Sequence, residues 1–255
     1  MIHYQSAICR RPSKSSTQGL TTANLGAADL TLLVRQHEQY LSTLIELGLD
    51  VTLLEAMEDF PDSYFTEDVA IVTPEVAVIT RPGAMQRRRE TQYIEDSLAK
   101  FRDLERIQKP GTLDGGDVLV VNKHCIVGIS ERTNHEGAIQ LGGILASFGY
   151  HTDIVTVPEA LHFKSSVNFL DEYSLLVTQA CHALDCISKY KKLVVPEGEE
   201  YAANVVWMND IILIPQGYSG TRRLLEENGY KVKELAVSEI SKMDGGLTCL
   251  SLRLT

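Results

Sequence analysis

The sequence predicts an α/β fold in which five modules, each with the order strand–strand–helix–strand, close into a ring. Three observations support this prediction. The module recurs at intervals of roughly 40–50 residues, as in arrays whose repeats bury their faces against one another. A short hairpin opens every module, and the βαβ units of an ordinary doubly wound sheet do not need one. The two ends of the chain together supply the fifth module, which closes the ring without an exposed edge.

The first two modules show the pattern most clearly, because paired apolar runs separated by turn residues precede a longer helical segment. In the first module, the hairpin strands, the helix and the closing strand are expected at 68–72, 76–80, 86–100 and 104–107. In the second module they are expected at 117–121, 125–129, 134–148 and 151–157. The hairpins turn at Thr73-Pro74-Glu75 and at Asn122-Lys123, where proline and asparagine favour turn conformations.

The remaining modules follow the same order. The third has strands at 166–170 and 173–177, a helical stretch, and a closing strand at 192–196. The fourth has its elements at 203–208, 211–215, 221–228 and 232–235. The fifth combines segments 3–9, 31–47 and 51–54 with a strand at 247–252. Because no Pro-, Gly- or Ser-rich linker divides them, residues 1–255 are predicted to form a single domain.

The composition argues against several classes of protein. The net charge of −10 disfavours a nucleic-acid-binding surface, which requires a basic face. Residues 1–22 lack the apolar core of a signal peptide, and no apolar run approaches the roughly 18 residues of a membrane helix. The five cysteines are scattered and odd in number, as expected for reduced thiols. We therefore expect a cytoplasmic protein with no nucleic-acid partner and no membrane contact.

Polar or reactive side chains recur where the first strand of each module begins. The pairs are Glu67-Asp68, Gly116-Asp117, Ser165-Ser166, Ala203-Asn204 and Thr248-Cys249. In a closed ring these equivalent positions point toward a shared centre, so their recurrence predicts an active site there. Cys249 follows the turn Gly245-Gly246 and lies near the start of the alternating run 247–252, which predicts a strand. A lone cysteine is more often an inert buried side chain, so its role depends on these neighbours.

Six segments spread along the chain carry recognisable motifs. They are FPDSYFTED (60–68), TRPGA (80–84), TLDGGDVL (112–119), SERTN (130–134), LHFKS (161–165) and DGGLTC (244–249). Together with Gly19-Leu20 they resemble, in the same order, the dimethylarginine dimethylaminohydrolases of the guanidine-modifying pentein superfamily, which also contains the arginine deiminases. The resemblance implies a five-bladed α/β propeller. It also implies a hydrolase that converts Nω-methylated arginine to citrulline and methylamine or dimethylamine, without a cofactor.

The resemblance implies three catalytic residues. Attack on a guanidinium carbon requires a thiolate, and Cys249 takes the position of the family's nucleophile. His162 takes the position of the general acid–base that protonates the leaving amine and deprotonates water. Asp114 would accept the other ring proton of His162, although some family members carry glutamate there. The structural alternative for Asp114 is a turn aspartate before two glycines. His182, beside Cys181, is interpreted as structural.

The acidic residues that match the family's substrate contacts lie in one segment. Asp68, with Glu67 beside it, would bind the guanidinium, because paired carboxylates match its planar donors. Asp62 would contact the amino-acid part of the substrate. From their spacing alone, these three acids could equally form a solvated acidic turn.

Basic and flexible positions complete the expected site. Arg87 and Arg132 match the family's arginines and would hold the α-carboxylate, although Arg87 also begins a basic run. Leu20 matches a lid position that closes over the ligand. Asp117 and Asp244 lie near the expected centre and would bind substrate or orient other groups.

Alternatives remain open. The same residues could act on free arginine, as in a deiminase, or on a differently substituted arginine, and a non-catalytic pentein that binds a macromolecule is a third interpretation. The sequence contains no His-Glu-x-x-His or Cys-x-x-Cys motif, so no metal site is expected. It contains no Gly-x-Gly-x-x-Gly or Walker motif, so no nucleotide cofactor is expected. The expected partner is a small-molecule methylated arginine, and the expected assembly is a monomer or homodimer.

Overall fold

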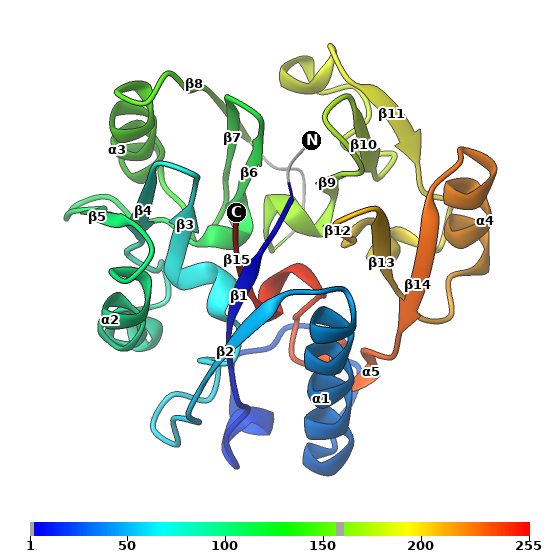
Figure 1. Ribbon diagram of the computed structural model, residues 1–255, viewed down its shortest axis with the longest axis horizontal. Coiled ribbons are helices and arrows are strands. Elements are labelled where there is room, and N and C mark those ends of the chain that lie inside the picture. Colours follow the sequence, from blue (N-terminus) through cyan, green and yellow to red (C-terminus); the bar gives the residue numbers. More distant parts are fainter. Residues whose placement is uncertain (1–2, 157–160) are drawn as a thin grey trace.

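The computed structural model describes residues 3–156 and 161–255 (Figure 1). The strands are β1 (Ser6–Arg10), β2 (Asp50–Leu54), β3 (Ala70–Val72), β4 (Val76–Ile79), β5 (Asp103–Arg106), β6 (Val118–Val121), β7 (His124–Ile129), β8 (His151–Thr156), β9 (Val167–Phe169), β10 (Ser174–Val177), β11 (Lys191–Val194), β12 (Val206–Met208), β13 (Ile211–Pro215), β14 (Lys231–Leu235) and β15 (Leu252–Leu254). The α-helices are α1 (Leu30–Glu46), α2 (Glu95–Leu98), α3 (His135–Ala146), α4 (Ser219–Glu227) and α5 (Ser238–Ser241).

Within the described residues these strands form five three-stranded sheets, which surround a common centre in Figure 1. The sheets are β15-β1-β2, β3-β4-β5, β6-β7-β8, β9-β10-β11 and β12-β13-β14. In each sheet the first two strands of the module are antiparallel, and the third strand is parallel to the second. Thus Val118 pairs with Val127 across the β6–β7 hairpin, and His124 pairs with His151 across the parallel pair. The predicted five-bladed α/β propeller is confirmed.

The sheet built from both chain ends also has the predicted form. Strand β1 pairs antiparallel with β15, with Ile8 opposite Leu252, and parallel with β2, with Ile8 opposite Thr52. Helix α1 connects β1 to β2 as a crossover of the kind that parallel strands require. Its N-cap, Asp29, accepts a hydrogen bond from the backbone N–H of Leu32. The first and last strands therefore lie side by side, and the ring closes.

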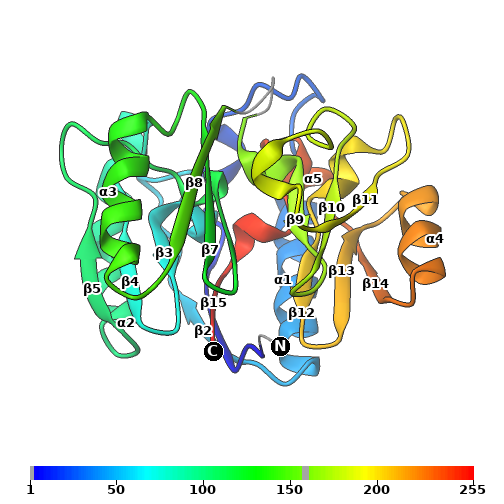
Figure 2. The same cartoon turned by 90° about the horizontal axis from the view of Figure 1, so that it is seen from above.

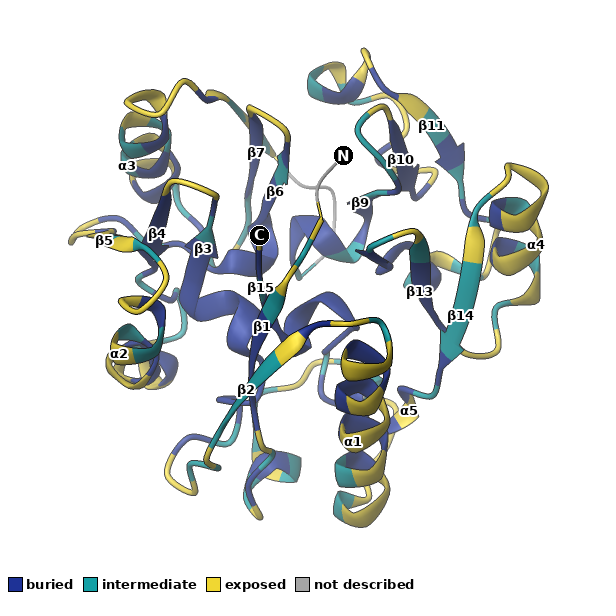
Figure 3. Cartoon of the chain, in the orientation of Figure 1, coloured by how far each residue is buried: buried dark blue, intermediate teal, exposed yellow. Residues whose placement is uncertain are grey.

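Burial follows the distance from the centre of the ring. Every residue of the middle strands β4 and β10 is buried, whereas the outer strand β5 is mostly exposed. Figure 3 shows the buried residues gathered around the centre, with exposed residues on the surrounding helices and loops. The sheets thus form a rigid frame around the segments that enter the centre.

Five short 3₁₀ turns, rather than strand starts, occupy the centre. They precede β3, β6, β9, β12 and β15, and they span Thr66–Val69, Gly115–Asp117, Phe163–Ser165, Glu200–Ala203 and Thr248–Leu250. The predicted strand at 247–252 is therefore wrong in its first half, because Cys249 lies in a turn and β15 begins only at Leu252. A three-residue turn has too few residues to show a helical period, so the alternating pattern was misleading.

Two predicted helices differ in the structure. The segment predicted as one helix at 86–100 is a 3₁₀ segment, Met85–Tyr93, followed by the short helix α2. The third module has no α-helix between β10 and β11, where turns and one 3₁₀ turn, Asp185–Ile187, make the connection. The predicted strand at 151–157 is observed as β8 up to Thr156, and Val157 lies outside the described residues.

Viewed from the side in Figure 2, the hairpin turns lie on the same side of the ring as the two chain ends. The loop that follows β1 lies on the opposite side. Among the described residues, none of the helices combines the length and the apolar character needed to cross a membrane. The ring therefore presents two different faces, one formed by hairpins and one by longer connections.

Candidate active site

Cys249 lies at the centre of the ring, in the turn Thr248–Leu250, and only 9% of it is exposed. Its sulfur accepts a hydrogen bond from the backbone N–H of Gly246 at 3.4 Å. The two preceding glycines are required by close packing. A Cβ at Gly246 would lie 2.4 Å from Oδ1 of Asn204, and one at Gly245 would lie 2.3 Å from Cε1 of Phe65. The glycines thus allow the turn that brings the thiol to the centre.

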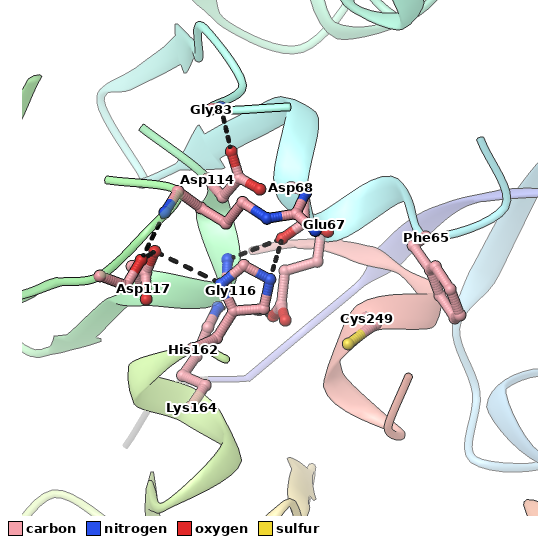
Figure 4. Close-up of polar contacts among 12 residues, drawn as sticks. Phe65, Glu67, Asp68, Gly83, Asp114, Gly116, Asp117, His162, Lys164 and Cys249 are labelled. Atoms are coloured by element: carbon pink, nitrogen blue, oxygen red, sulfur yellow. Dashed lines mark hydrogen bonds and ion pairs between the residues drawn. The ribbon is translucent and has the colours of Figure 1, made fainter. Parts of the chain in front are cut away.

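His162 immediately precedes the turn Phe163–Ser165 and is 7% exposed. Its Nδ1 atom lies 3.3 Å from Oδ2 of Asp117, and its Nε2 atom lies 4.0 Å from Oδ1 of Asp68. Figure 4 shows the imidazole of His162 between these two carboxylates, with the sulfur of Cys249 facing the side chains of Glu67 and His162. The thiol and the imidazole therefore come from different modules and meet at the centre.

Asp68 and Asp114, which both lie close to His162, have different partners. Asp68 accepts a hydrogen bond from the backbone N–H of Gly116 at 2.9 Å and forms an ion pair with Arg87 at 2.6 Å. Asp114 accepts a hydrogen bond from the backbone N–H of Gly83 at 2.8 Å, while its buried Oδ2 atom has no partner. The predicted hydrogen bond between Asp114 and His162 does not form in this structure. The short aspartate side chain is instead held by Gly83 (Figure 4).

Charges in the site shift several ionisations. Burial disfavours the charged form of His162, but the carboxylates of Asp117, Asp68 and Asp114 outweigh burial and raise its pKa to about 9. Burial also opposes ionisation of Asp68, but Arg87 and His162 lower its pKa to about 2. Burial, together with the charge of Asp68, raises the pKa of Asp114 to about 6. At neutral pH His162 is therefore protonated and Asp68 ionised.

The surroundings of Cys249 disfavour ionisation of its thiol. Burial, reinforced by the carboxylates of Glu67 and Asp68, raises the pKa of Cys249 to about 12. Glu67 also holds two cations with one oxygen, because its Oε1 atom lies 2.6 Å from Nζ of Lys164 and 3.1 Å from a guanidinium nitrogen of Arg253. Its Oε2 atom is buried without a partner. Without substrate, Cys249 is a neutral thiol.

Sequence reasoning missed Lys164, which lines one of the two cavities, and Arg253, which is connected to the site through Glu67. Lys164 lies two residues after His162, within the motif that identified the histidine. Arg253 and Glu67 are 186 residues apart in the chain. A charged residue in β15, otherwise formed by leucines, was the available signal for Arg253.

The two predicted arginines differ in their availability. Arg87 is 4% exposed and donates to the carboxylates of Asp68 and Glu90 and to the carbonyls of Asp62 and Phe65. In the described part of the chain, the guanidinium of Arg132 forms no hydrogen bond and no ion pair, and only its backbone N–H donates, to the hydroxyl of Ser130. Arg132 is therefore free to bind an anionic group, whereas Arg87 mainly fixes the acidic loop.

The segment predicted to act as a lid is held by two carboxylates. The backbone N–H of Leu20 donates to both oxygens of Asp62, and Thr22 donates to Asp244 through its backbone N–H and its hydroxyl. Asp244 adopts a left-handed conformation, with φ of 59°, immediately before the glycine turn. Asp244 thus contacts the lid segment.

One cavity brings most of the predicted residues together. Its lining includes Leu20, Asp62, Asp68, Arg87, Arg132, His162, Asp244 and Cys249. Glu67 lines an adjoining cavity of about 320 Å³, which shares His162 and Cys249 with the first. Asp114 lines neither cavity. The arrangement places a thiol and an imidazolium where these two cavities adjoin, with carboxylates in both and the free cation of Arg132 in the first, which suits a cationic amino acid.

The spacing of one acidic group also resembles a metal site. Among the described residues, Asp68, Asp114 and His162 have ligand atoms within 4.8 Å of one another. The guanidinium of Arg87, which is paired with Asp68, already supplies a cation to this group. The donor set therefore fits the protein's own charges better than a divalent ion.

Comparison with known proteins gives consistent matches. The family model for arginine deiminase matches residues 49–179. The N(G),N(G)-dimethylarginine dimethylaminohydrolase of Pseudomonas aeruginosa is 39% identical over 252 residues, which cover 98% of this chain and 99% of that protein. The protein of the same name from Streptomyces coelicolor is 34% identical and covers 97% of this chain and 96% of its own length.

Solved structures match equally well. The Pseudomonas aeruginosa enzyme, as a C249S mutant complexed with citrulline, superposes with a TM-score of 0.97 at 38% identity and covers 99% of this chain and 100% of that one. A dimethylarginine dimethylaminohydrolase with the H162G substitution, solved as an adduct with S-methyl-L-thiocitrulline, gives a TM-score of 0.96 and covers 98% of this chain and 99% of that one. The N-terminal domain of a cyanobacterial arginine dihydrolase, at 20% identity and a TM-score of 0.84, shares the fold over 97% of each chain.

Proposed function

The chain belongs to the dimethylarginine dimethylaminohydrolase family, and from this premise we propose that it hydrolyses Nω-methylated arginines to citrulline and methylamine or dimethylamine. The observation that carries the proposal is the single cavity in which Cys249 and His162 face Asp68 and Arg132. The citrulline complex and the thiocitrulline adduct of the related structures support a product and an intermediate of this kind.

Binding uses the charges around the cavity. The guanidinium of the substrate lies beside the carboxylates of Glu67 and Asp68, and Asp68 remains ionised because of Arg87. The α-carboxylate pairs with Arg132, whose guanidinium is uncommitted. Asp62 and Leu20 close the cavity around the amino-acid end. The substrate is thus held by opposite charges at its two ends.

The bound substrate also activates the nucleophile. Cys249 is a neutral thiol in the free protein, and a guanidinium placed beside it stabilises the thiolate, so that the thiol proton is released to solvent when the substrate binds. The thiolate attacks the guanidinium carbon, and the sulfur–carbon bond forms. Collapse of the tetrahedral adduct breaks the bond to the methylated nitrogen, and His162 gives its proton to the departing amine. This step leaves a thiouronium on Cys249 and a neutral imidazole.

Hydrolysis completes the reaction. The neutral His162 takes a proton from water, and the resulting hydroxide attacks the thiouronium carbon. Collapse of the second adduct breaks the sulfur–carbon bond, and the hydroxyl proton of the adduct passes to the departing sulfur. This step forms the carbonyl of citrulline and regenerates the Cys249 thiol and the protonated His162. No external oxidant, reductant or cofactor is consumed in this sequence.

The experiment that tests the mechanism is substitution of the nucleophile. Cys249→Ser is expected to fold normally and to lose more than about a thousandfold in citrulline release. The matched control is Cys186→Ser, which changes a partly exposed cysteine outside the cavity and should retain activity. Near-normal turnover by folded Cys249→Ser would contradict the mechanism.

The setting of the enzyme follows the same reasoning. We infer a cytoplasmic, single-domain protein over residues 1–255 that needs no cofactor, no metal, no nucleic acid and no membrane. The five free cysteines, four of them buried, support a reducing compartment. The proposed assembly is a monomer or homodimer, which light scattering after size-exclusion chromatography would decide.

A further inference from the structure

We propose that Asp117, rather than Asp114, is the positioning residue that sets the orientation and the tautomer of His162. The inference rests on the proposed function, because it assigns a role within that reaction. Asp117 is 0% exposed and lies at the end of the turn Gly115–Asp117, opposite the imidazole (Figure 4). Its Oδ2 atom is the carboxylate oxygen at 3.3 Å from Nδ1 of His162.

Asp117 is held firmly by its other partners. Its Oδ2 atom accepts hydrogen bonds from the hydroxyls of Ser130 at 2.7 Å and Thr133 at 2.6 Å. Its Oδ1 atom accepts one from the backbone N–H of Phe163, the residue next to His162, at 3.0 Å. One carboxylate therefore holds the backbone beside the histidine by a hydrogen bond and faces the imidazole through an ion-pair contact. Such support restricts the imidazole more tightly than a single contact would.

The contacts also determine which ring nitrogen carries out proton transfer. Nδ1 of His162 forms no hydrogen bond of standard geometry among the described residues, and it makes an ion-pair contact with Oδ2 of Asp117 at 3.3 Å. Because a carboxylate that already receives several donors acts as an acceptor, this contact places the Nδ1 proton on the side of Asp117. The Nε2 atom then remains for exchange with the substrate. It lies on the side of Asp68, and His162 and Cys249 line the same cavity. Asp117 thus leaves the transferable proton facing the reaction.

Asp114 is less suited to this role. Its Oδ1 atom is occupied by the backbone N–H of Gly83, and its Oδ2 atom has no partner. It lines neither of the two cavities that contain His162. The charge of Asp114 also raises the pKa of His162, but by less than the charges of Asp117 and Asp68 do.

The charged and titratable groups that surround His162 come from several elements. The turn Thr66–Val69 contains Glu67 and Asp68, and Asp68 is paired with Arg87. The turn Gly115–Asp117 contains Asp117, and Asp114 immediately precedes it. Lys164 follows on the histidine's own segment, and Cys249 lies across the cavity. Because the remaining groups are the same in single variants, the two aspartates can be compared directly.

The test measures the pH dependence of kcat and the pKa of His162 in Asp117→Asn and Asp114→Asn. In Asp117→Asn, kcat is expected to fall on the order of a hundredfold, within the range of acid–base contributions, with a much smaller change in KM. The high-pH limb of kcat should move to lower pH. In Asp114→Asn the limb should move less. Asp153→Asn, on the outer strand β8, should leave the profile unchanged and serves as the control.

The NMR titration of His162, assigned with a His162→Asn spectrum, provides a readout that does not depend on turnover. A larger downward pKa shift in Asp117→Asn than in Asp114→Asn supports the proposal. A larger shift in Asp114→Asn overturns it, and so does an unmoved pKa in folded Asp117→Asn. If Asp117→Asn does not fold, a downward shift of more than one pH unit in Asp114→Asn also overturns the proposal, and a smaller one supports it. If the wild type hydrolyses no guanidine, the proposed function fails, while the titration still decides the contact.

Discussion

Both carboxylate oxygens of Asp62 accept the backbone N–H of Leu20, at 3.1 and 3.2 Å, and so tie the lid to the acidic loop. The carbonyl of Asp62 in turn accepts a hydrogen bond from Arg87, the buried arginine that also pairs with Asp68. The segment predicted as a lid is therefore connected through Asp62 and Arg87 to Asp68, the carboxylate proposed to bind the guanidinium of the substrate. Closure of the cavity and order of the acidic loop are parts of one network.

Asp62→Ala should weaken substrate binding, because the lid loses its anchor and the amino-acid end loses a partner. We expect KM to rise about tenfold, equivalent to roughly 1.4 kcal/mol, with a smaller change in kcat. Glu58→Ala is the matched control, since Glu58 accepts the backbone N–H of Lys14 with both oxygens in an exposed setting. A similar rise in KM in both variants would contradict the specific role of Asp62.

The reactivity of Cys249 should depend steeply on pH in the free enzyme. Burial and the nearby carboxylates raise the pKa of this thiol to about 12, so the thiolate fraction increases about tenfold per pH unit below that value. We expect the rate of alkylation by iodoacetamide, followed by mass spectrometry of the Cys249 peptide, to rise continuously from pH 7 to pH 9. A plateau below pH 8 would show a resting thiolate and contradict the account.

Stability should also depend on pH through His162. Its pKa is about 9 in the folded protein, against 6.5 for an ordinary histidine. The stabilisation is therefore fully present below pH 6.5 and is lost as the pH rises through 9. The shift corresponds to a contribution on the order of 3 kcal/mol. In urea unfolding at pH 6 and pH 10, His162→Asn should show a smaller decline than the wild type. An equal decline in both proteins would disprove this coupling.

Two glycines of helix α3 provide a test of the packing. A Cβ at Gly137 would lie 2.0 Å from the carbonyl oxygen of Thr112, so Gly137→Ala should destabilise the protein by about 1–3 kcal/mol. A Cβ at Gly143 meets no atom within 4 Å, so Gly143→Ala should stabilise it by about 0.5–1 kcal/mol. Urea unfolding of the pair checks the opposite signs, and a stabilising Gly137→Ala would contradict the close approach of this glycine to Thr112.

The sequence was sufficient to predict the closed ring, because a hairpin recurs in each module and because segments from the two chain ends together form the fifth module. It was not sufficient to predict the conformation of the segments at the centre of the ring. Cys249 and Asp117 lie in three-residue turns, which are too short to leave a periodic signal. The third module's connection was also misjudged, since Asp185–Ile187 forms a single 3₁₀ turn where a helix was expected.

The contacts within the site were harder to predict than its members. The motifs located His162 and Asp114, but only the three-dimensional structure could show that Asp117 lies nearer to the ring and that Gly83 holds Asp114. The same holds for Glu67 and Arg253, whose ion pair joins residues that are 186 positions apart in the chain. Spacing along the sequence carries no information on such pairs, because each side chain is delivered by a different module.

The most direct test of the account compares citrulline release from asymmetric dimethylarginine, monomethylarginine and unsubstituted arginine under identical conditions. The account predicts a higher kcat/KM for the methylated substrates, with dimethylamine or methylamine released in equal amounts with citrulline. Turnover of arginine alone, with release of ammonia, would contradict the proposed substrate and identify a deiminase built on the same ring.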